Sequence, residues 1–150
     1  LTLGGQRCAE PVMCTDFFPT ILELCGVAAT DKAAPNGPLD GLSLVPLLKQ
    51  PRSRLQRDAL FFHYPHYYMT TTPVSAVRVG DWKLLEYFED NHVELYHLRD
   101  DLGERHDLAG QQPERVARLG TRLHDWWKET GAQLPVVNAN YSSGPPKVGP

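Results

Sequence analysis

The chain has 150 residues, of which 41% are hydrophobic and 22% charged, a composition typical of a globular domain with its own core. Its formal net charge is −3 and it has no run of basic residues, which argues against a nucleic-acid partner. No apolar stretch approaches the roughly 20 residues that span a bilayer. We therefore expect a protein that neither binds nucleic acid nor crosses a membrane.

The first residues, LTLGGQRCAEP, have neither the basic nor the apolar segment of a signal peptide, and they include no initiator Met. We therefore expect the chain to begin inside a longer protein. Its three cysteines, Cys8, Cys14 and Cys25, fit no disulfide framework and no zinc-binding spacing. We interpret them as small apolar side chains.

The first predicted element is a helix over 16–25. Asp16 is placed to cap its N-terminus, Pro19 falls at the third helical position, and Gly26 can end it in the left-handed conformation. Its apolar side chains recur on one face: Phe17, Phe18, Ile21, Leu22 and Cys25. Because this face is large for so short a helix, we expect it to be exposed in this chain and to promote self-association.

Residues 27–42 are rich in Gly, Pro and polar side chains, which predicts a loop. A helix of two turns is predicted from Ser43 to Lys49. Ser43 serves as its N-cap, Pro46 lies in its first turn, and Pro51 stops it.

The centre of the chain contains four runs rich in β-branched and aromatic residues, which predict strands over 59–64, 73–79, 82–88 and 92–99. Gly80 and Asp81 join the second and third runs, and Gly at the first position of a two-residue loop is typical of a type II′ turn. A second tight connection, 89–91, joins the third and fourth runs. We therefore expect a small antiparallel sheet built from consecutive hairpins.

A second long helix is predicted from Pro113 to Thr130, with Gly131 just beyond its end. Its apolar stripe should cover one face of the sheet: Val116, Leu119, Leu123, Trp126 and Thr130. An irregular, proline-containing tail follows over 136–150. The predicted fold class is therefore α+β, with a sheet of about four strands packed against a C-terminal helix and preceded by one or two short helices.

The hexapeptide HYPHYY, residues 63–68, places two imidazoles and three phenols around a proline. These rings can cap the core at the end of a strand. Alternatively, His63, His66 and Tyr67 can hydrogen-bond a sugar, and a charged imidazolium can pair with an anion. An HxxH metal site is a third alternative, but the proline disfavours a helix and no third ligand has a suitable spacing.

Arg78 and Lys83 face each other across the predicted two-residue hairpin. Two opposed like charges are unfavourable unless a carboxylate or an anionic ligand joins them. The sequence leaves both partners open, the carboxylate being Glu86, Glu94 or one elsewhere.

The connector after the sheet is acidic, but it lacks the order of an EF-hand calcium loop: Asp100, Asp101, Glu104 and Asp107. The sequence also contains no GxSxG, phosphate-binding loop or HExxH motif. The residues by themselves thus indicate an α+β domain with a polar aromatic patch and no particular reaction.

Three segments resemble, in the same order and spacing, the C-terminal third of sulfatases: PVMCTDFFPTILELCGV, LDGLSLVPLLK and SAVRVGDWKLLEYFEDNHVELYHLRDDLGERHDLA. The resemblance covers about residues 10–140, and HYPHY is closer to bacterial carbohydrate sulfatases than to vertebrate arylsulfatases. It implies that residues 1–50 form the end of an alkaline-phosphatase-like catalytic domain, that 51–135 form the smaller C-terminal subdomain, and that 136–150 form the tail.

Sulfatases carry a C/S-x-P-x-R motif, whose Cys or Ser is oxidised to formylglycine, together with a calcium ion that helps to hold the sulfate. No cysteine of this chain is followed by x-P-x-R, and the nearest sequence, starting at Ser143, lies in the tail and ends in Lys. The resemblance therefore implies a fragment that lacks the nucleophile and the metal site and is inactive alone. Calcium and formylglycine are expected in the full-length enzyme, in the missing N-terminal catalytic domain.

The resemblance implies that the full-length enzyme removes sulfate from a sulfated carbohydrate, and that it is exported, as its relatives commonly are. Five residues are candidate substrate contacts: His63, His66, Tyr67, Arg78 and Lys83. A free-standing carbohydrate-binding or interaction module is the alternative. A phosphoryl-transfer relative is disfavoured by the segments SAVRVGDWKLLE and VELYHLRDDLGE.

Overall fold

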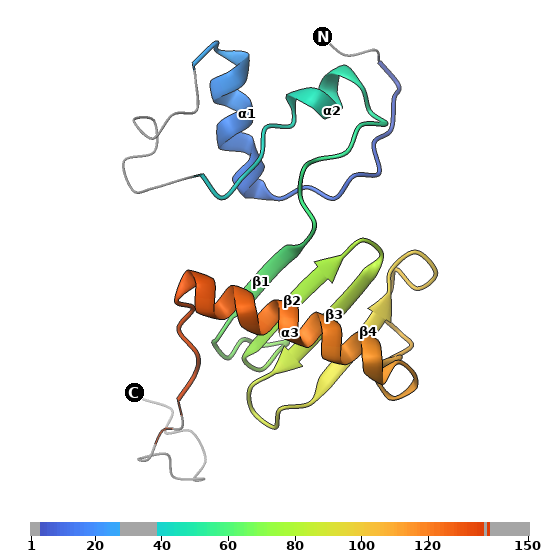
Figure 1. The fold of residues 1–150 in the computed structure, drawn as a ribbon, viewed down its shortest axis with the longest axis vertical. Helices are drawn as coiled ribbons and strands as arrows, with labels where there is room; N and C mark the ends of the chain where they lie inside the picture. The colour runs from blue at the N-terminus through green and yellow to red at the C-terminus, as the bar shows by residue number, and fades with distance from the viewer. Residues whose placement is uncertain (1–3, 28–38, 137, 139–150) are drawn as a thin grey trace, which may run out of the picture. The chain divides into compact units, whose positions relative to one another are not determined.

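The structure, a computed structural model, describes residues 4–27, 39–136 and 138. The chain divides into two compact units, Leu1–Arg57 and Asp58–Pro150 (Figure 1). Most of the loop predicted at 27–42 and of the tail predicted at 136–150, including Ser143, lies outside the described residues. In the described part of the chain, no helix has the length and apolar character needed to cross a membrane.

The first unit contains a 3-10 turn, η1 (Cys14–Asp16), and two short helices, α1 (Phe17–Leu24) and α2 (Val45–Lys49). Both helices occur where the sequence predicts them. Pro19 is the third residue of α1 and Gly26 has φ 70°, as expected for a left-handed residue after a helix. The Ser43 hydroxyl accepts a hydrogen bond from the Val45 N–H at 3.2 Å, but the N-cap residue of α2 is Leu44, so the prediction that Ser43 is the N-cap is wrong by one residue.

Asp16 is the polar centre of the first unit, and the prediction that its side chain caps α1 is wrong. Its side chain is fully buried and makes no cap hydrogen bond. Instead, the carboxylate accepts hydrogen bonds from the backbone N–H groups of Met13 (2.8 Å) and Leu42 (2.9 Å), and it pairs with Arg57. Both oxygens are therefore occupied by segments that α1 alone does not contain.

The apolar face of α1 is exposed at Phe17, Phe18 and Ile21, as the sequence predicts. Leu22 is half-buried, and Leu24 is exposed in its place. Self-association through this face stays a prediction.

The second unit is a four-stranded antiparallel sheet with its strands in chain order: β1 (Leu60–Tyr64), β2 (Val74–Val79), β3 (Trp82–Tyr87) and β4 (Val93–His97). A short turn, η2 (Ala109–Gln111), leads into α3 (Pro113–Thr130), which lies across one face of the sheet (Figure 1). The predicted α+β class is confirmed. Gly80 has φ 58° while Asp81 has no positive φ, which fits a type II′ turn and not a type I′ turn.

The core lies between α3 and one face of the sheet. Because side chains alternate along a strand, Val77, Leu84 and Leu95 point to the same face. They pack with Leu119 and Leu123 of α3, and none of these five side chains is more than 2% exposed. The predicted stripe of α3 is thereby confirmed at its centre.

The stripe does not extend to the last turn of α3. Thr130 is exposed, and its hydroxyl donates a hydrogen bond to the Trp126 carbonyl at 2.8 Å. The helix ends at Gly131, which has φ 63°, as predicted.

We expect Leu84→Ala to lower the free energy of unfolding of the second unit by about 2–5 kcal/mol, because it leaves a cavity in a core without solvent contact. Urea unfolding followed by Trp fluorescence measures this, since all three Trp lie in the second unit. Leu102→Ala, at a side chain 81% exposed, is the matched control and should change stability by less than about 0.5 kcal/mol. Equal losses in the two variants would contradict this core.

Acid should destabilise the first unit through Asp16. Burial by itself raises the pKa of this carboxyl, but the hydrogen bonds from Arg57, Met13 and Leu42 outweigh it and lower the pKa below 3.8. A lowered pKa contributes stability that is present above the unfolded value and is lost as the pH falls through the folded value.

Asp16→Asn should therefore cost about 3–5 kcal/mol at neutral pH, because Arg57 loses its buried partner. The difference from the unaltered chain should shrink as the pH falls below about 4. Urea unfolding followed by NMR at the Leu42 amide measures both quantities. A difference that does not change with pH would refute the role assigned to the Asp16 carboxylate.

Candidate functional site

His63 is held inside the second unit by hydrogen bonds at both ring nitrogens. Nδ1 lies 2.6 Å from the Ser75 hydroxyl oxygen, and Nε2 lies 3.0 Å from the Gln133 carbonyl oxygen. A carbonyl can only accept, so Nε2 carries the proton and neutral Nδ1 accepts from Ser75. The Ser75 oxygen accepts in turn from the Trp127 indole N–H at 3.2 Å. This geometry matches the structural alternative for His63.

His66 and Tyr67 are exposed in the connection between β1 and β2. The His66 ring lies edge-on to Tyr64 with the ring centroids 5.7 Å apart. The Tyr67 hydroxyl lies 3.4 Å from a carboxylate oxygen of Glu89, so it reaches the turn between β3 and β4. Both side chains are therefore exposed on the connection between β1 and β2.

Arg78 and Lys83 are opposite each other in the β2–β3 register, as the sequence predicts. Lys83 Nζ donates to both carboxylate oxygens of Glu104, at 2.7 and 2.8 Å. Arg78 Nε donates to the Gly80 carbonyl oxygen at 3.0 Å. The compensating carboxylate is therefore Glu104.

The two carboxylates named from the sequence have other partners. Glu86 lies on the face that α3 covers, where its carboxylate is 2.7 Å from His124 Nε2. Glu94 lies on the opposite face and accepts a hydrogen bond from the Tyr87 hydroxyl at 3.1 Å.

The five candidate residues do not form one cluster. The β1–β2 connection that carries His66 and Tyr67 lies at the end of β2 that begins with Val74, whereas Arg78 and Lys83 flank the hairpin at its other end. Four residues of extended chain separate Val74 from Arg78, a distance of about 13 Å. His63 belongs to a third environment, under α3.

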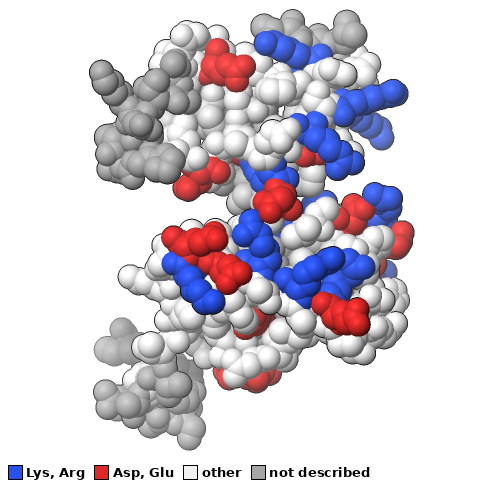
Figure 2. Space-filling model, in the orientation of Figure 1, with Lys and Arg blue, Asp and Glu red and all other residues white. Residues whose placement is uncertain are grey.

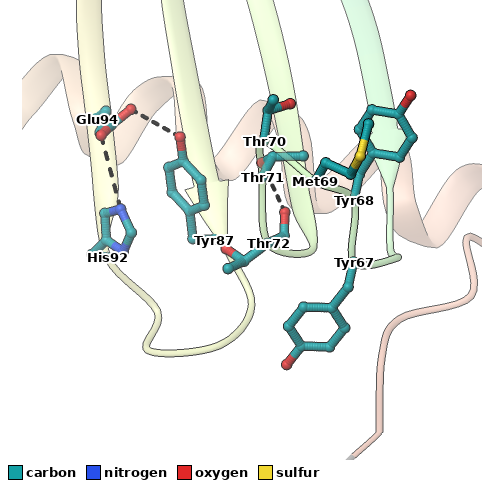
Figure 3. Close-up of a pocket in the computed structure, with 9 residues that line it drawn as sticks. All are labelled: Tyr67, Tyr68, Met69, Thr70, Thr71, Thr72, Tyr87, His92 and Glu94. Carbon is teal, nitrogen blue, oxygen red and sulfur yellow. Dashed lines mark hydrogen bonds and ion pairs between the residues drawn. The ribbon is translucent and has the colours of Figure 1, made fainter. Parts of the chain in front are cut away.

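A depression of about 430 Å³ opens beside Tyr67, on the sheet face that α3 does not cover (Figure 3). One wall is the connection between β1 and β2, and the other comes from β3, β4 and the turn between them. Nine residues line it: Tyr67, Tyr68, Met69, Thr70, Thr71, Thr72, Tyr87, His92 and Glu94. Its volume suits a single small polar ligand such as one sugar ring.

The wall formed by β3, β4 and the turn between them contains polar rings and a carboxylate that interact with one another. The rings of Tyr87 and His92 stack with centroids 4.1 Å apart, and His92 Nε2 lies 3.9 Å from Glu94. Burial and the Glu94 carboxylate raise the pKa of Tyr87 to about 12, so the phenol stays protonated at neutral pH. Hydrogen bonds from His92 hold the pKa of Asp90, just outside the depression, below its usual value.

Most of the lining was not singled out from the sequence. Side chains alternate along β3 and β4, so Tyr87 and Glu94 lie on the face away from Leu84 and Leu95. This placement could have been predicted from the sequence. The position of residues 67–72 beside Tyr87 and Glu94 could not have been predicted, because it depends on a turn in which Tyr68 and Thr71 form an isolated bridge.

Two carboxylates of the acidic connector accept hydrogen bonds from backbone N–H groups. Asp101 accepts hydrogen bonds from the N–H groups of Arg105 and His106, which lower its pKa. Asp107 accepts from the Leu95 N–H at 2.9 Å and so covers the open edge of β4. Among the described residues, no three His, Cys, Asp or Glu side chains are grouped to hold a metal ion.

Basic and acidic side chains lie side by side on the face of the second unit shown in Figure 2. Two of the arginines of α3 are already engaged: Arg122 pairs with Asp58 at 3.1 Å, and the Arg115 guanidinium lies 3.9 Å from the Trp82 ring centroid. This face therefore lacks a field of one sign, and the depression is the better candidate site.

Comparison with known families identifies this α+β domain as the C-terminal part of a sulfatase. Residues 3–131 match the family described as N-sulphoglucosamine sulphohydrolase, C-terminal. The chain belongs to this family.

Similar proteins occur in bacteria and vertebrates. The chain is 26% identical to a sulfatase of Formosa agariphila over 97% of its own length and 28% of the relative. It is 32% identical to arylsulfatase K of Danio rerio over 74% of its length and 21% of the relative. A solved structure described as a 2-O GAG sulfatase matches with a TM-score of 0.63 and 28% identity, over 78% of this chain and 25% of that one. The chain thus spans about a quarter of the length of these proteins.

We expect Glu94→Gln to lower the pKa of Tyr87 from about 12 toward, but not to, the ordinary value of 10.0, because burial remains when the carboxylate charge is lost. An NMR titration of the tyrosine ring carbons measures this. Glu89→Gln, in the adjacent turn, is the control and should leave the pKa of Tyr87 where it is. The same Tyr87 pKa in both variants would show that Glu94 does not act on this phenol.

Proposed function

We propose that the protein containing this chain is a sulfuric ester hydrolase that removes sulfate from a sulfated carbohydrate. The observation that carries the proposal is the family match over residues 3–131, because every segment with a described helix or strand falls inside it. The chain covers 28% or less of the relatives reported above, so the reaction itself belongs to the remaining part of such a protein.

A carbohydrate substrate is supported by the chemistry of the depression. Tyrosine offers a broad amphipathic surface, and hydroxyl and carboxylate oxygens hydrogen-bond to sugar hydroxyls. Tyr67, Tyr68 and the three threonines at 70–72 supply such groups in the depression that Glu94 also lines. The 2-O GAG sulfatase that shares this fold fits the same substrate class.

Calcium and formylglycine are implied for the full-length enzyme by the family alone. The described residues do not fit them: they contain no group of three possible metal ligands, and no Cys precedes x-P-x-R anywhere in the chain. We therefore derive no catalytic step through either group. The contribution of this chain is to bind and orient the carbohydrate.

Within that role, His66 and Tyr67 are the proposed substrate contacts, and the end of the sheet at Arg78 and Lys83 is the proposed contact for an anionic group of the substrate. His63 is proposed to act on the substrate only through the backbone it positions, because both of its nitrogens are occupied.

The whole encoded protein should release inorganic sulfate from sulfated oligosaccharides, and ion chromatography measures this. His66→Ala should raise KM by about 2- to 10-fold with a smaller effect on kcat, since one hydrogen bond contributes about 0.5–1.5 kcal/mol. His106→Ala, at another exposed imidazole, is the matched control and should leave KM unchanged.

An encoded protein that binds carbohydrate but releases no sulfate would support the alternative, a carbohydrate-binding module. Unchanged kcat and KM in His66→Ala would remove His66 from the substrate site while leaving the proposed reaction intact.

A further inference from the structure

We propose that the depression at Tyr67–Thr72, Tyr87, His92 and Glu94 binds a sugar unit that carries neither sulfate nor carboxylate. This inference rests on the proposed function, and it adds the charge class of the sugar at this place. The sulfated unit of the same substrate would then lie elsewhere.

The local charge excludes an anion. The segments that build the walls, 58–77 and 84–98, contain no Lys or Arg, while the turn between β3 and β4 and the start of β4 carry three carboxylates: Glu89, Asp90 and Glu94. Glu94 lines the depression itself. A sulfate placed here would meet the like charge of Glu94, and these segments supply no Lys or Arg to pair with it.

Two hydroxyls of the depression already donate to the protein, and the Glu94 carboxylate can only accept. The Tyr87 hydroxyl already donates a hydrogen bond to Glu94, and the Thr71 hydroxyl donates one to the Thr72 carbonyl oxygen at 3.0 Å. An ionised carboxylate has about four acceptor positions, and the tyrosine hydroxyl fills one at Glu94. Glu94 therefore favours a ligand that brings donors, which sugar hydroxyls and amino groups supply and sulfate and carboxylate groups do not.

The wall opposite Glu94 suits the apolar face of a sugar ring. Tyr67, Tyr68 and Met69 are each at least 60% exposed, although their side chains are large. Figure 3 shows the Tyr68 and Met69 side chains together on the side of the depression away from Glu94. Carboxylate on one side and aromatic rings on the other is an arrangement for a hydroxylated, uncharged ring.

The two cations on this face of the sheet are too far from the depression to offset the negative charge of Glu94. Arg78 and Lys83 flank the β2–β3 hairpin, and four residues of β3 separate Lys83 from Tyr87, or about 13 Å. At physiological ionic strength this exceeds the Debye length of about 8 Å. Glu94 is the carboxylate that lines the depression itself, and the charge of Lys83 is already paired with Glu104.

The test is an NMR titration of the 150-residue chain with two matched pairs of monosaccharides. One pair is N-acetylglucosamine and its 6-sulfate, and the other is glucose and glucuronate. The amides of Thr70, Thr71 and His92 should shift with the uncharged member of each pair. The anionic member should bind at least fivefold more weakly, the factor that corresponds to about 1 kcal/mol.

Glu94→Gln should retain the affinity for N-acetylglucosamine within about threefold. In each pair, the dissociation constants of the anionic and the uncharged sugar should become nearly equal. Glu86→Gln is the matched control, because Glu86 lies on the other face of the same sheet, and it should keep the ratio of the unaltered chain. Equal or tighter binding of the sulfated sugar, or no shift at these amides with any of the four sugars, would overturn the inference.

The outcome is separable from that of the proposed function. Sulfate release by the whole encoded protein without selectivity here would overturn the inference alone. Selectivity here without sulfate release would support the inference for a carbohydrate-binding protein and refute the hydrolase.

Discussion

The second unit depends on the buried hydroxyl of Ser75, because this is where β1, β2 and α3 are joined by polar contacts inside an apolar interface. It accepts a hydrogen bond from Trp127 and donates one to His63, which in turn donates to the Gln133 carbonyl just past α3. Ser75 is the fully buried member of this chain, and a buried polar group left unsatisfied costs about 1–3 kcal/mol. Apolar packing holds α3 against the sheet. The hydrogen bonds through Ser75 help to fix the position of α3 on the sheet.

This constraint also decides which part of the HYPHYY segment is free for a ligand. His63 is committed to the core side of β1, and the strand ends at Tyr64. Pro65 then stiffens the backbone where it leaves the sheet, so the side chains at 66 and 67 project beyond the last strand pair. The same alternation that buries Leu84 and Leu95 under α3 turns Tyr87 and Glu94 toward the opposite face. The core and the candidate site therefore lie on opposite faces of the same strands.

Much of this could be predicted because it is encoded locally. Hydrophobic periodicity, turn residues and the two-residue hairpin at Gly80 and Asp81 define the strands, α3 and the Arg78–Lys83 register. The roles of Asp16 and Glu104 could not be predicted, because their partners lie 26 or more residues away for Leu42 and Arg57, and 21 away for Lys83. The depression could not be predicted either: Tyr87 and Glu94 are ordinary strand residues until the 67–72 turn approaches them, and no local pattern specifies that approach.

The pairing of Lys83 with Glu104 shows how an unfavourable register is tolerated. Two cations opposed across an antiparallel pair destabilise it, yet here one cation is neutralised by a bidentate carboxylate and the other donates to the Gly80 carbonyl. Both side chains of the ion pair are partly exposed, at 23% and 32%, and an ion pair in such a place contributes about 0–1 kcal/mol. An anion that displaced Glu104 would therefore meet little resistance. At this end of the sheet a protein carboxylate already compensates Lys83, whereas at the other end Glu94 lines a depression whose walls carry no Lys or Arg.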